Sequence, residues 1–515
     1  MNGAQALLRT LLASGVDTCF ANPGTSEMHF VAALDEVPEM RGVLCLFEGV
    51  VTGAADGYGR MADDPAATLL HLGPGLGNGI ANLHNARRAH TGIVNVVGDH
   101  ATHHLKYDAP LTSDIDSVAR NVSGWIRHSA GTEQLGDDAV EAVVAARAGQ
   151  VATLVLPADV SWGEGGKPAE APVAVPAARV ADEAVRTVAE ALRGDEAALL
   201  LLGGSACQER GLRAAARIAA ATGARLLVET FPARLQRGAG LPAVDRLAYL
   251  AEFAEAQLAG TQHLVLAGAA SPASFFAYPN RPSDLVPGGA TVHPLAAATD
   301  DVADALERLA EALGAPADVA VAPAARPELP TGPLTAAAVA DAVGALLPER
   351  AIISDEAQTS GLWLPGATGG APAHDVLTLT GGAIGQGLPV AVGAAVACPD
   401  RPVLALQADG SAMYTISALW TMAREQLDVT TIVYNNRSYA ILAMELQRVG
   451  AATDGVKARA LLDLSGPDLD FVALGTGMGV PSTRATTAEE FVEQLQTALA
   501  EPGPHLIEAV VPSVV

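Results

Sequence analysis

Residues 403–436 read VLALQADGSAMYTISALWTMAREQLDVTTIVYNN, and this stretch decides the fold. It begins with an apolar run, 403–407, that is typical of a buried strand and ends just before Asp409. A second apolar run, 430–434, leads to Asn436. Between the runs, apolar residues recur at three- and four-residue steps, which predicts one amphipathic helix carrying Met413, Ile416, Trp420, Ala423 and Leu427. The stretch therefore predicts a strand–helix–strand unit.

Such a unit brings Asp409 and Asn436 to the same edge of a parallel sheet, because the crossover is right-handed. Gly410 and Ser411 would offer backbone N–H groups to an anion at the start of the helix. Oxygen ligands of this kind suit Mg²⁺, which completes its shell with water and diphosphate oxygens. An ordinary βαβ unit with an Asp-Gly turn gives the same pattern, so both interpretations are open at this point.

The DGS sequence followed by a double Asn resembles the thiamine-diphosphate (ThDP) motif of 2-oxo acid decarboxylases and acetolactate synthases. Ala408 stands where the family has Gly, but the Asp and the two residues after it are kept. The resemblance implies that the metal ligands are the Asp409 carboxylate, the Asn436 side-chain oxygen and the Ser438 carbonyl. Cofactor binding would also involve Gly410, Ser411 and Tyr439.

A second motif lies near the N-terminus, where the apolar run 43–47 predicts a buried strand and Glu48 opens a helix of small residues. An acid at a helix start can simply complement the helix dipole, and this alternative is open. The resemblance implies that Glu48 hydrogen-bonds the pyrimidine ring of ThDP and shares its proton with N1′. The cofactor would then lose its thiazolium C2 proton and become the ylid that attacks a carbonyl carbon.

The glycine-rich segment GGAIGQG at 381–387 is by itself equally consistent with a turn. By resemblance, Ile384 would wedge ThDP into its bent conformation, and the carbonyl of Gly382 would hold the cofactor's amino group. Thr359, which ends the sequence DEAQT, would contact the diphosphate. The resemblance therefore extends through most of the chain.

On the substrate side, the motifs resemble benzoylformate decarboxylase most closely. The loop NPGTSE at 22–27 is part of this resemblance, which implies that Thr25, with Ser26 beside it, faces the substrate carboxylate. His71 follows a predicted strand and precedes GPGLGN, as the active-site histidine of that enzyme does, although a structural histidine is the alternative. The second active-site histidine of that enzyme is missing, because the segment 271–281 offers phenylalanines and a tyrosine instead.

The pocket wall is predicted to be aliphatic, made by Leu111, Ile441 and Leu442, with plain helix core as the alternative for these residues. His103 and His104 resemble the paired histidines of pyruvate decarboxylases, but they stand closer to the preceding strand. A solvated loop is the better interpretation, so we leave them out of the catalytic set.

The composition is that of a large enzyme without nucleic-acid or membrane partners. The chain has 515 residues and a formal net charge of −26, which disfavours binding to nucleic acids and anionic membranes. No apolar run reaches membrane-spanning length, and no basic segment with a cleavage site opens the chain. The cysteines are scattered without a Cys-x-x-Cys pair, so we expect a reduced, cytoplasmic protein; they are Cys19, Cys45, Cys207 and Cys398.

Two Pro/Ala/Gly-rich stretches, 163–178 and 314–332, divide the chain into thirds. We expect a three-domain α/β protein with a pyrimidine-binding domain at 1–162, a central domain at 179–313 and a diphosphate-binding domain at 333–515. The central third has Gly203-Gly204 after a strand but no G-x-G-x-x-G sequence, so FAD is not expected.

The resemblance implies addition of the ThDP ylid to a 2-oxo acid, loss of CO₂, and either protonation of the enamine to an aldehyde or its ligation to a second carbonyl. The alternatives are a flavin-containing acetolactate synthase and a catalytically silent relative kept for ligand binding. In the family, two subunits build each site, so Glu48 of one chain would meet cofactor held by Asp409 and Asn436 of another. A homodimer is then the minimal unit, and we expect a homotetramer.

Overall fold

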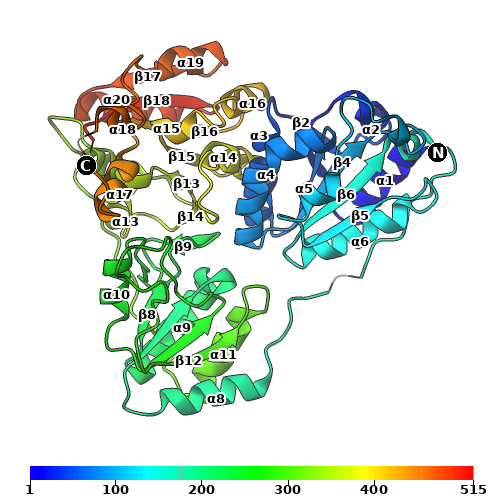
Figure 1. Cartoon of the computed structure of the whole chain (residues 1–515). Helices are drawn as coiled ribbons and strands as arrows, with labels where there is room; N and C mark the ends of the chain where they lie inside the picture. Colours follow the sequence, from blue (N-terminus) through cyan, green and yellow to red (C-terminus); the bar gives the residue numbers. More distant parts are fainter. Residues whose placement is uncertain (174, 454, 514–515) are drawn as a thin grey trace.

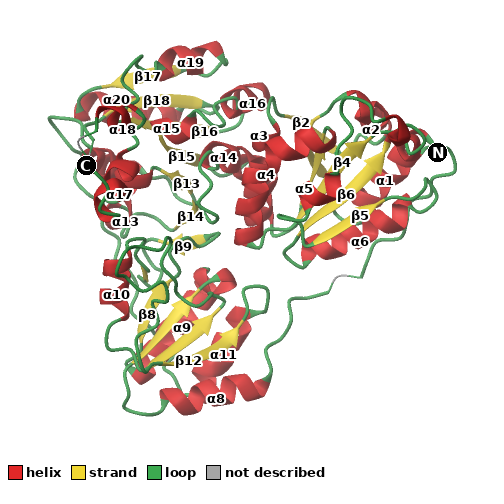
Figure 2. Cartoon of the chain, in the orientation of Figure 1, coloured by secondary structure: helices red, strands yellow, loops and turns green. Residues whose placement is uncertain are grey.

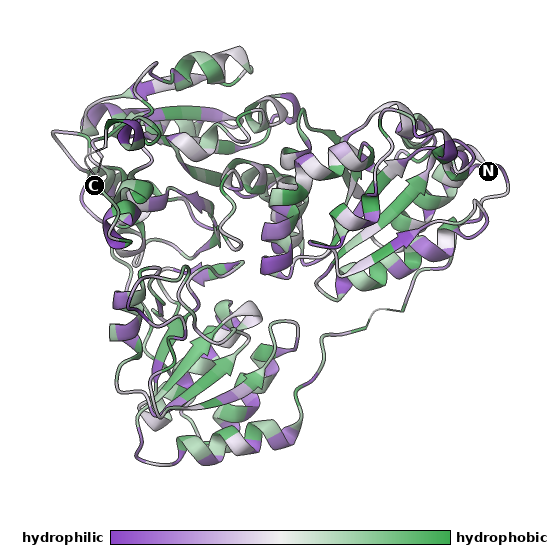
Figure 3. Cartoon of the chain, in the orientation of Figure 1, coloured by the Kyte–Doolittle hydropathy of each residue, from purple (hydrophilic) through white to green (hydrophobic). Residues whose placement is uncertain are grey.

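The computed structural model describes residues 1–173, 175–453 and 455–513. Within these residues the strands form three sheets of six, five and seven strands, each packed between helices (Figures 1 and 2). The sheets are apolar and the outer helix faces polar, as Figure 3 shows. The predicted three-part α/β fold is confirmed. No helix in the described part of the chain is long and apolar enough to cross a membrane.

The first sheet is parallel throughout and has the order β2-β1-β3-β4-β6-β5. Its side chains alternate between two cores, because neighbouring residues of a strand point to opposite faces. Its strands are β1 (Thr18–Asn22), β2 (Arg41–Leu44), β3 (Ala66–Leu70), β4 (Ile93–Asp99), β5 (Trp125–His128) and β6 (Val151–Pro157). Its helices are α1 (Gly3–Ala13), η1 (Thr25–Glu27), α2 (Met28–Glu36), α3 (Glu48–Ala62), α4 (Leu72–Ala89), η2 (Leu105–Tyr107), α5 (Ile115–Ala119), α6 (Leu135–Arg147) and α7 (Ala158–Trp162).

The second sheet is also parallel, with the order β10-β8-β7-β11-β12. Its strands are β7 (Ala198–Leu202), β8 (Arg225–Val228), β10 (Asp245–Arg246), β11 (His263–Ala267) and β12 (Thr291–Ala296). Its helices are α8 (Asp182–Leu192), η3 (Gly204–Cys207), α9 (Glu209–Thr222), α10 (Ala251–Leu258) and α11 (Val302–Ala312).

The third sheet has the order β17-β18-β16-β15-β13-β14-β9, and only β9, which comes from the central part of the chain, is antiparallel. Its strands are β9 (Leu235–Arg237), β13 (Ile352–Glu356), β14 (His374–Thr378), β15 (Val403–Ala408), β16 (Val429–Asn435), β17 (Ser482–Ala485) and β18 (His505–Val510). Its helices are α12 (Ala336–Leu346), η4 (Gln358–Gly361), α13 (Leu364–Ala367), α14 (Gly387–Ala397), α15 (Asp409–Ala412), α16 (Ala418–Glu425), α17 (Ala440–Arg448), α18 (Val456–Ala460), α19 (Phe471–Gly477) and α20 (Ala488–Ala500).

Two predicted elements are wrong in their extent. The strand expected over 43–47 ends at Leu44, and Leu46 is exposed because the chain turns away from the sheet before Glu48. The single helix expected after Asp409 is two helices, α15 and α16. The chain between them bends toward the glycine-rich loop, where the Thr415 hydroxyl donates to the carbonyl of Gly385 at 2.9 Å.

The first and third sheets are joined by α3 and α14, which pack against each other at the centre of the molecule (Figure 1). Small residues make this close approach possible. A Cβ atom added to Gly57 would lie 2.7 Å from the Cα of Val390, and one added to Gly53 would lie 2.5 Å from the Cβ of Pro389. One continuous apolar core therefore runs from the first sheet into the third.

Candidate active site

The first part of the candidate site lies at the carboxyl edge of the third sheet. Ala408 pairs with Tyr434 across β15 and β16, so Asp409 lies beside the end of the next strand, as the sequence predicts. Its carboxylate is buried and accepts from the backbone N–H of Gly410 at 2.8 Å and of Arg437 at 2.6 Å. Burial raises the pKa of Asp409, and these two hydrogen bonds oppose the rise.

The residues that follow β16 turn back over Asp409. The side-chain oxygen of Asn436 accepts from the backbone N–H of Ser438 at 2.9 Å. The ring of Tyr439 lies against Gly410, where any added Cβ would collide with it. The described residues hold no cluster of three or more His, Cys, Asp or Glu that could bind a metal ion. The donors here are instead one carboxylate, one amide oxygen and one carbonyl, hard ligands that fit Mg²⁺.

The glycine-rich loop is held by α4 of the first domain rather than by its own domain alone. Asn85 Nδ2 donates to the carbonyl of Ala383 at 2.8 Å, and Asn82 Nδ2 donates to that of Gly385 at 3.3 Å. Gly382 has a φ of +75°, which a residue with a side chain rarely adopts. Ile384 is half-buried in this loop. The two asparagines were not identified from the sequence, because nothing near them marks a partner some three hundred residues away.

A buried ion pair ties the same loop to α3. Arg60 and Asp56 lie one helical turn apart with their charged atoms 2.6 Å apart, and both side chains are almost fully buried. Arg60 also donates to the carbonyl of Thr378 at 2.8 Å, and Gln386 Nε2 donates to Asp56 at 3.0 Å. The loop that contains Gly382 and Ile384 is therefore fixed from both α3 and α4.

Glu356, at the end of β13, connects the glycine-rich loop to the carboxyl edge of the third sheet. Its carboxylate accepts from the backbone N–H of Gly385 at 2.7 Å and of Gly387 at 2.6 Å, and from Gln407 Nε2 at 2.9 Å. Gln407 also contacts the Ser411 hydroxyl at 2.5 Å. Burial raises the pKa of Glu356 despite these bonds. Thr359 lies three residues further on, half-buried in η4 at the same sheet edge.

The second part of the site lies at the carboxyl edge of the first sheet, where Glu48 is the first residue of α3. Its side chain is buried and accepts from Asn78 Nδ2 of α4 at 3.0 Å. A Cβ added to Gly75 would lie 3.2 Å from Glu48 Oε1, so the glycine leaves room for this carboxylate. Asn78 lies in the GPGLGN sequence but was not assigned a role from it.

His71 follows β3 and caps α4 at the same edge. Its Nδ1 lies 2.9 Å from Glu27 Oε2, which also accepts from the backbone N–H of Gly24 at 2.8 Å. Glu27 is 1% exposed, and burial raises its pKa although both bonds oppose the rise. Thr25 is exposed in η1, two residues before Glu27. The sequence motif NPGTSE contains Glu27, but its pairing with His71 depends on the neighbouring strands β1 and β3.

The remaining predicted residues lie nearer the surface. Leu111 is 39% exposed and Leu442 is 46% exposed, while Ile441 is half-buried. His103 and His104 are exposed in a loop after β4, and His103 lies 3.7 Å from Asp159. Leu442 is therefore not helix core in the described chain, which removes that alternative for it.

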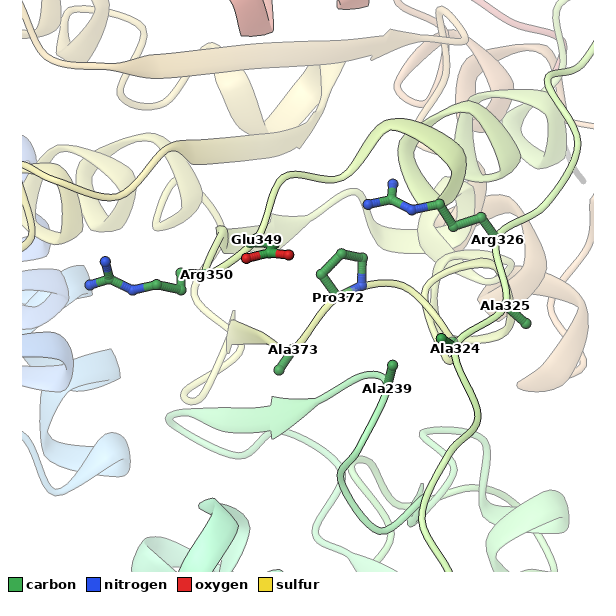
Figure 4. Close-up of a pocket in the computed structure, with 9 residues that line it drawn as sticks. Ala239, Ala324, Ala325, Arg326, Glu349, Arg350, Pro372 and Ala373 are labelled. Atoms are coloured by element: carbon green, nitrogen blue, oxygen red, sulfur yellow. The ribbon is translucent and has the colours of Figure 1, made fainter.

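Among the described residues, no hydrogen bond or ion pair joins Thr25, Glu48 or His71 to the segment 409–439. A hollow of about 680 Å³ does exist between the central and third domains, but it lies elsewhere and is lined by Glu349, Arg350, Pro372 and small residues (Figure 4). Its Arg326 and Arg350 already bond Ala345 and Asp400.

Comparison with known proteins agrees with this geometry. The N-terminal TPP binding domain of thiamine pyrophosphate enzymes matches residues 1–120, and the C-terminal TPP binding domain matches residues 360–509. The chain belongs to the thiamine pyrophosphate enzymes. This family accounts for both edges, because Glu48 and His71 lie in the first matched domain and Asp409 and Asn436 lie in the second.

Individual relatives in this family cover the whole chain. IlvX of Mycobacterium tuberculosis, which carries the name of an acetolactate synthase large subunit, is 65% identical over 100% of both chains. Benzoylformate decarboxylase of Pseudomonas aeruginosa is 30% identical over 96% of both. The structure of a ThDP-dependent 4-hydroxybenzoylformate decarboxylase from Rhodococcus jostii RHA1 matches with a TM-score of 0.85 at 26% identity, over 99% of both chains. The predicted relation to acetolactate synthases and benzoylformate decarboxylase is confirmed.

Proposed function

We propose that this enzyme uses ThDP and Mg²⁺ to decarboxylate a 2-oxo acid in the cytoplasm, and that it releases an aldehyde or joins the remaining carbon unit to a second carbonyl compound. The observation that carries the proposal is the buried Asp409 carboxylate, which faces backbone N–H groups but no cationic side chain within the described chain. A buried charge needs compensation, and a divalent cation that also binds a diphosphate supplies it.

At the third sheet, each proposed ligand is held by its neighbours. Asp409, Asn436 and the carbonyl of Ser438 would bind the cation, and Gly410, Ser411 and Thr359 would contact the diphosphate. Tyr439 would close the site over Gly410. Gly382 and Ile384 would hold the cofactor rings, because Asn82, Asn85 and Glu356 fix their loop.

At the first sheet, the side chains are arranged to hold and move protons. These residues would act with ThDP, which would supply a carbanion equivalent for the keto carbon and an acceptor for the electrons released with CO₂. Glu48 would protonate the pyrimidine ring, and Asn78 orients its carboxylate. His71 would move a proton at the substrate, because Glu27 holds Nδ1 and thereby turns the other ring nitrogen outward. Thr25 would donate a hydrogen bond to the substrate carboxylate.

A second copy of the chain would complete the site, since Glu48 and His71 make no hydrogen bond or ion pair with the described segment 409–439 of their own chain. Glu48 of one chain would then act on cofactor held by Asp409 of another, which makes a homodimer the smallest active form and a homotetramer the expected one. Exposed apolar side chains border the third-sheet edge and would be covered in such an assembly; they are Leu362, Trp363, Met413, Tyr414 and Leu442.

The test is release of CO₂ from a panel of 2-oxo acids by protein supplied with ThDP and Mg²⁺. We expect CO₂ from at least one acid, and product analysis then separates the aldehyde from a hydroxyketone. His71→Ala should slow a proton-transfer step by a factor on the order of a hundred. The matched control is His505→Ala, a change of the same kind at a half-buried position at the amino end of β18. If the protein bound ThDP but released CO₂ from none of the acids, the alternative of a catalytically silent relative would replace the proposed function.

A further inference from the structure

The helix that follows the cofactor-binding segment, α17, carries one apolar and two charged residues on the same face. Ile441, Glu445 and Arg448 are four and then three residues apart on α17, so they lie on one face of this helix. The helix starts directly after Ser438 and Tyr439. For a substrate that reacted beside Ile441, Glu445 would lie about 6 Å further along the helix axis. That is about the distance from the keto carbon of an aryl 2-oxo acid to a substituent opposite on its ring.

The central domain places an aromatic wall beside the same site. Phe275 lies against the cofactor loop, since a Cβ added to Gly382 would be 2.6 Å from the Phe275 ring. The ring centroid of Phe275 is 5.1 Å from that of Tyr249 and 5.9 Å from that of Phe231. Phe275 is 42% exposed in the chain, so it presents ring surface to a ligand beside Gly382. A wall of this kind suits a flat aromatic substrate body.

The charged residues of α17 lie next to an aromatic residue of the central domain, Tyr278. The Arg448 guanidinium lies over the Tyr278 ring, 4.6 Å from its centroid, and it forms an ion pair with Glu252 of α10. Glu445 Oε1 and Arg448 Nε are 3.4 Å apart, and both atoms are buried without a hydrogen bond to any described residue. Burial and then the Glu445 carboxylate raise the pKa of Tyr249, which indicates that Glu445 faces the wall.

The charges of Glu252, Glu445 and Arg448 favour a hydrogen-bond donor on the ligand. Arg448 is shared between two carboxylates, Glu252 and Glu445, so an acceptor is left over at Glu445. Arg281 does not supply the missing cation, because it pairs with Glu255 at 3.3 Å. A carboxylate on the substrate would be repelled here, whereas a hydroxyl group could donate to the Glu445 carboxylate, whose side chain is 16% exposed.

We propose that Glu445, at the end of the aromatic wall, binds a hydroxyl group on the far side of an aryl 2-oxo acid. The inference rests on the proposed function, because that function places the keto carbon beside Ile441. It makes Glu445 the specificity-determining residue of the pocket, with Arg448 and Tyr278 holding its carboxylate in position.

The test uses two pairs of ligands with protein supplied with ThDP and Mg²⁺. The first pair is mandelate and 4-hydroxymandelate, which lack the keto group and only bind, and their affinities are measured by calorimetry. The second pair is benzoylformate and its 4-hydroxy derivative, compared by kcat/KM for CO₂ release. We expect the wild type to prefer the hydroxylated member of each pair by about tenfold to a hundredfold, the usual effect of a hydrogen bond to a charged acceptor.

The variants decide whether Glu445 is responsible. Glu445→Gln and, as a second variant, Tyr278→Phe should bring the preference close to one, whereas Glu255→Gln on α10 should leave it as in the wild type. A preference that survives Glu445→Gln, or a wild type without any preference, overturns the inference. If no 2-oxo acid releases CO₂ but the mandelate preference exists and depends on Glu445, the ligand inference stands and the proposed reaction fails.

Discussion

The carboxyl edges of the first and third sheets both follow parallel strands, but their polar groups are held in different ways. At the first edge, two of the proposed functional side chains are each held by another side chain, Glu48 by Asn78 and His71 by Glu27. At the third edge, the groups are backbone N–H donors around Asp409. Side chains can take up and release protons, whereas a backbone cradle can only hold a charged group. The difference supports the proposal that proton transfer takes place at the first edge and cofactor binding at the third.

The largest effect is expected at the first edge. Glu48→Gln should lower turnover by about a hundredfold to ten-thousandfold, because Gln can still bond the pyrimidine ring but cannot transfer a proton. Cofactor binding should remain within a small factor of wild type, and hydrogen exchange at C2 of bound ThDP, followed by NMR, should slow in parallel with turnover. Asn78→Asp is a useful comparison, since it places a second carboxyl group beside Glu48. Unchanged exchange in Glu48→Gln would move proton transfer to another residue.

At the third edge, the expected effect is on binding. Asp409→Ala should weaken Mg²⁺-dependent ThDP binding by more than about a hundredfold, because it removes the charged ligand of the cation. Calorimetry with and without Mg²⁺ measures this loss. Asp400→Ala is the matched control, since Asp400 precedes the same strand at its other end and pairs with Arg350 on the surface. Equal ThDP affinity in Asp409→Ala and Asp400→Ala would contradict the assignment of the site.

The smallest effect concerns the loop between the edges. Glu356→Gln should lower the free energy of unfolding by about 1–3 kcal/mol, because an amide group would face the backbone N–H donors of Gly385 and Gly387. The folded protein raises the pKa of Glu356, so the stability from this group is complete below the ordinary pKa of glutamate. It is lost as the pH rises through the raised value.

The variant lacks this titration, so its stability deficit relative to wild type should be largest at acidic pH and shrink toward neutral pH. Thermal unfolding of both proteins across that range measures the difference. A deficit that grows with pH would mean that the three hydrogen bonds to Glu356 stabilise it as a carboxylate more than burial destabilises that form.

Much of each edge could be predicted from the sequence, because it depends on local signals. An apolar run that ends in Asp-Gly-Ser specifies a strand followed by a helix start, and β15 and α15 have that form. Glu48 at the first turn of α3 was predicted in the same way. The helix after Asp409 was predicted too long, because the apolar spacing continues through residues 413–417. In the structure the Thr415 hydroxyl bonds the carbonyl of Gly385, and the next helix begins only at Ala418.

The sequence by itself determined the α/β class, the two strand ends and the residues that lie on them, because strand and helix periods and turn residues act over short distances. Only the tertiary structure decided what those residues touch. Glu27 meets His71, Asn85 meets the loop at Ala383, and Phe275 meets Gly382. These partners are far apart in the chain, and sheet order and helix packing bring them together, so no local pattern could specify them.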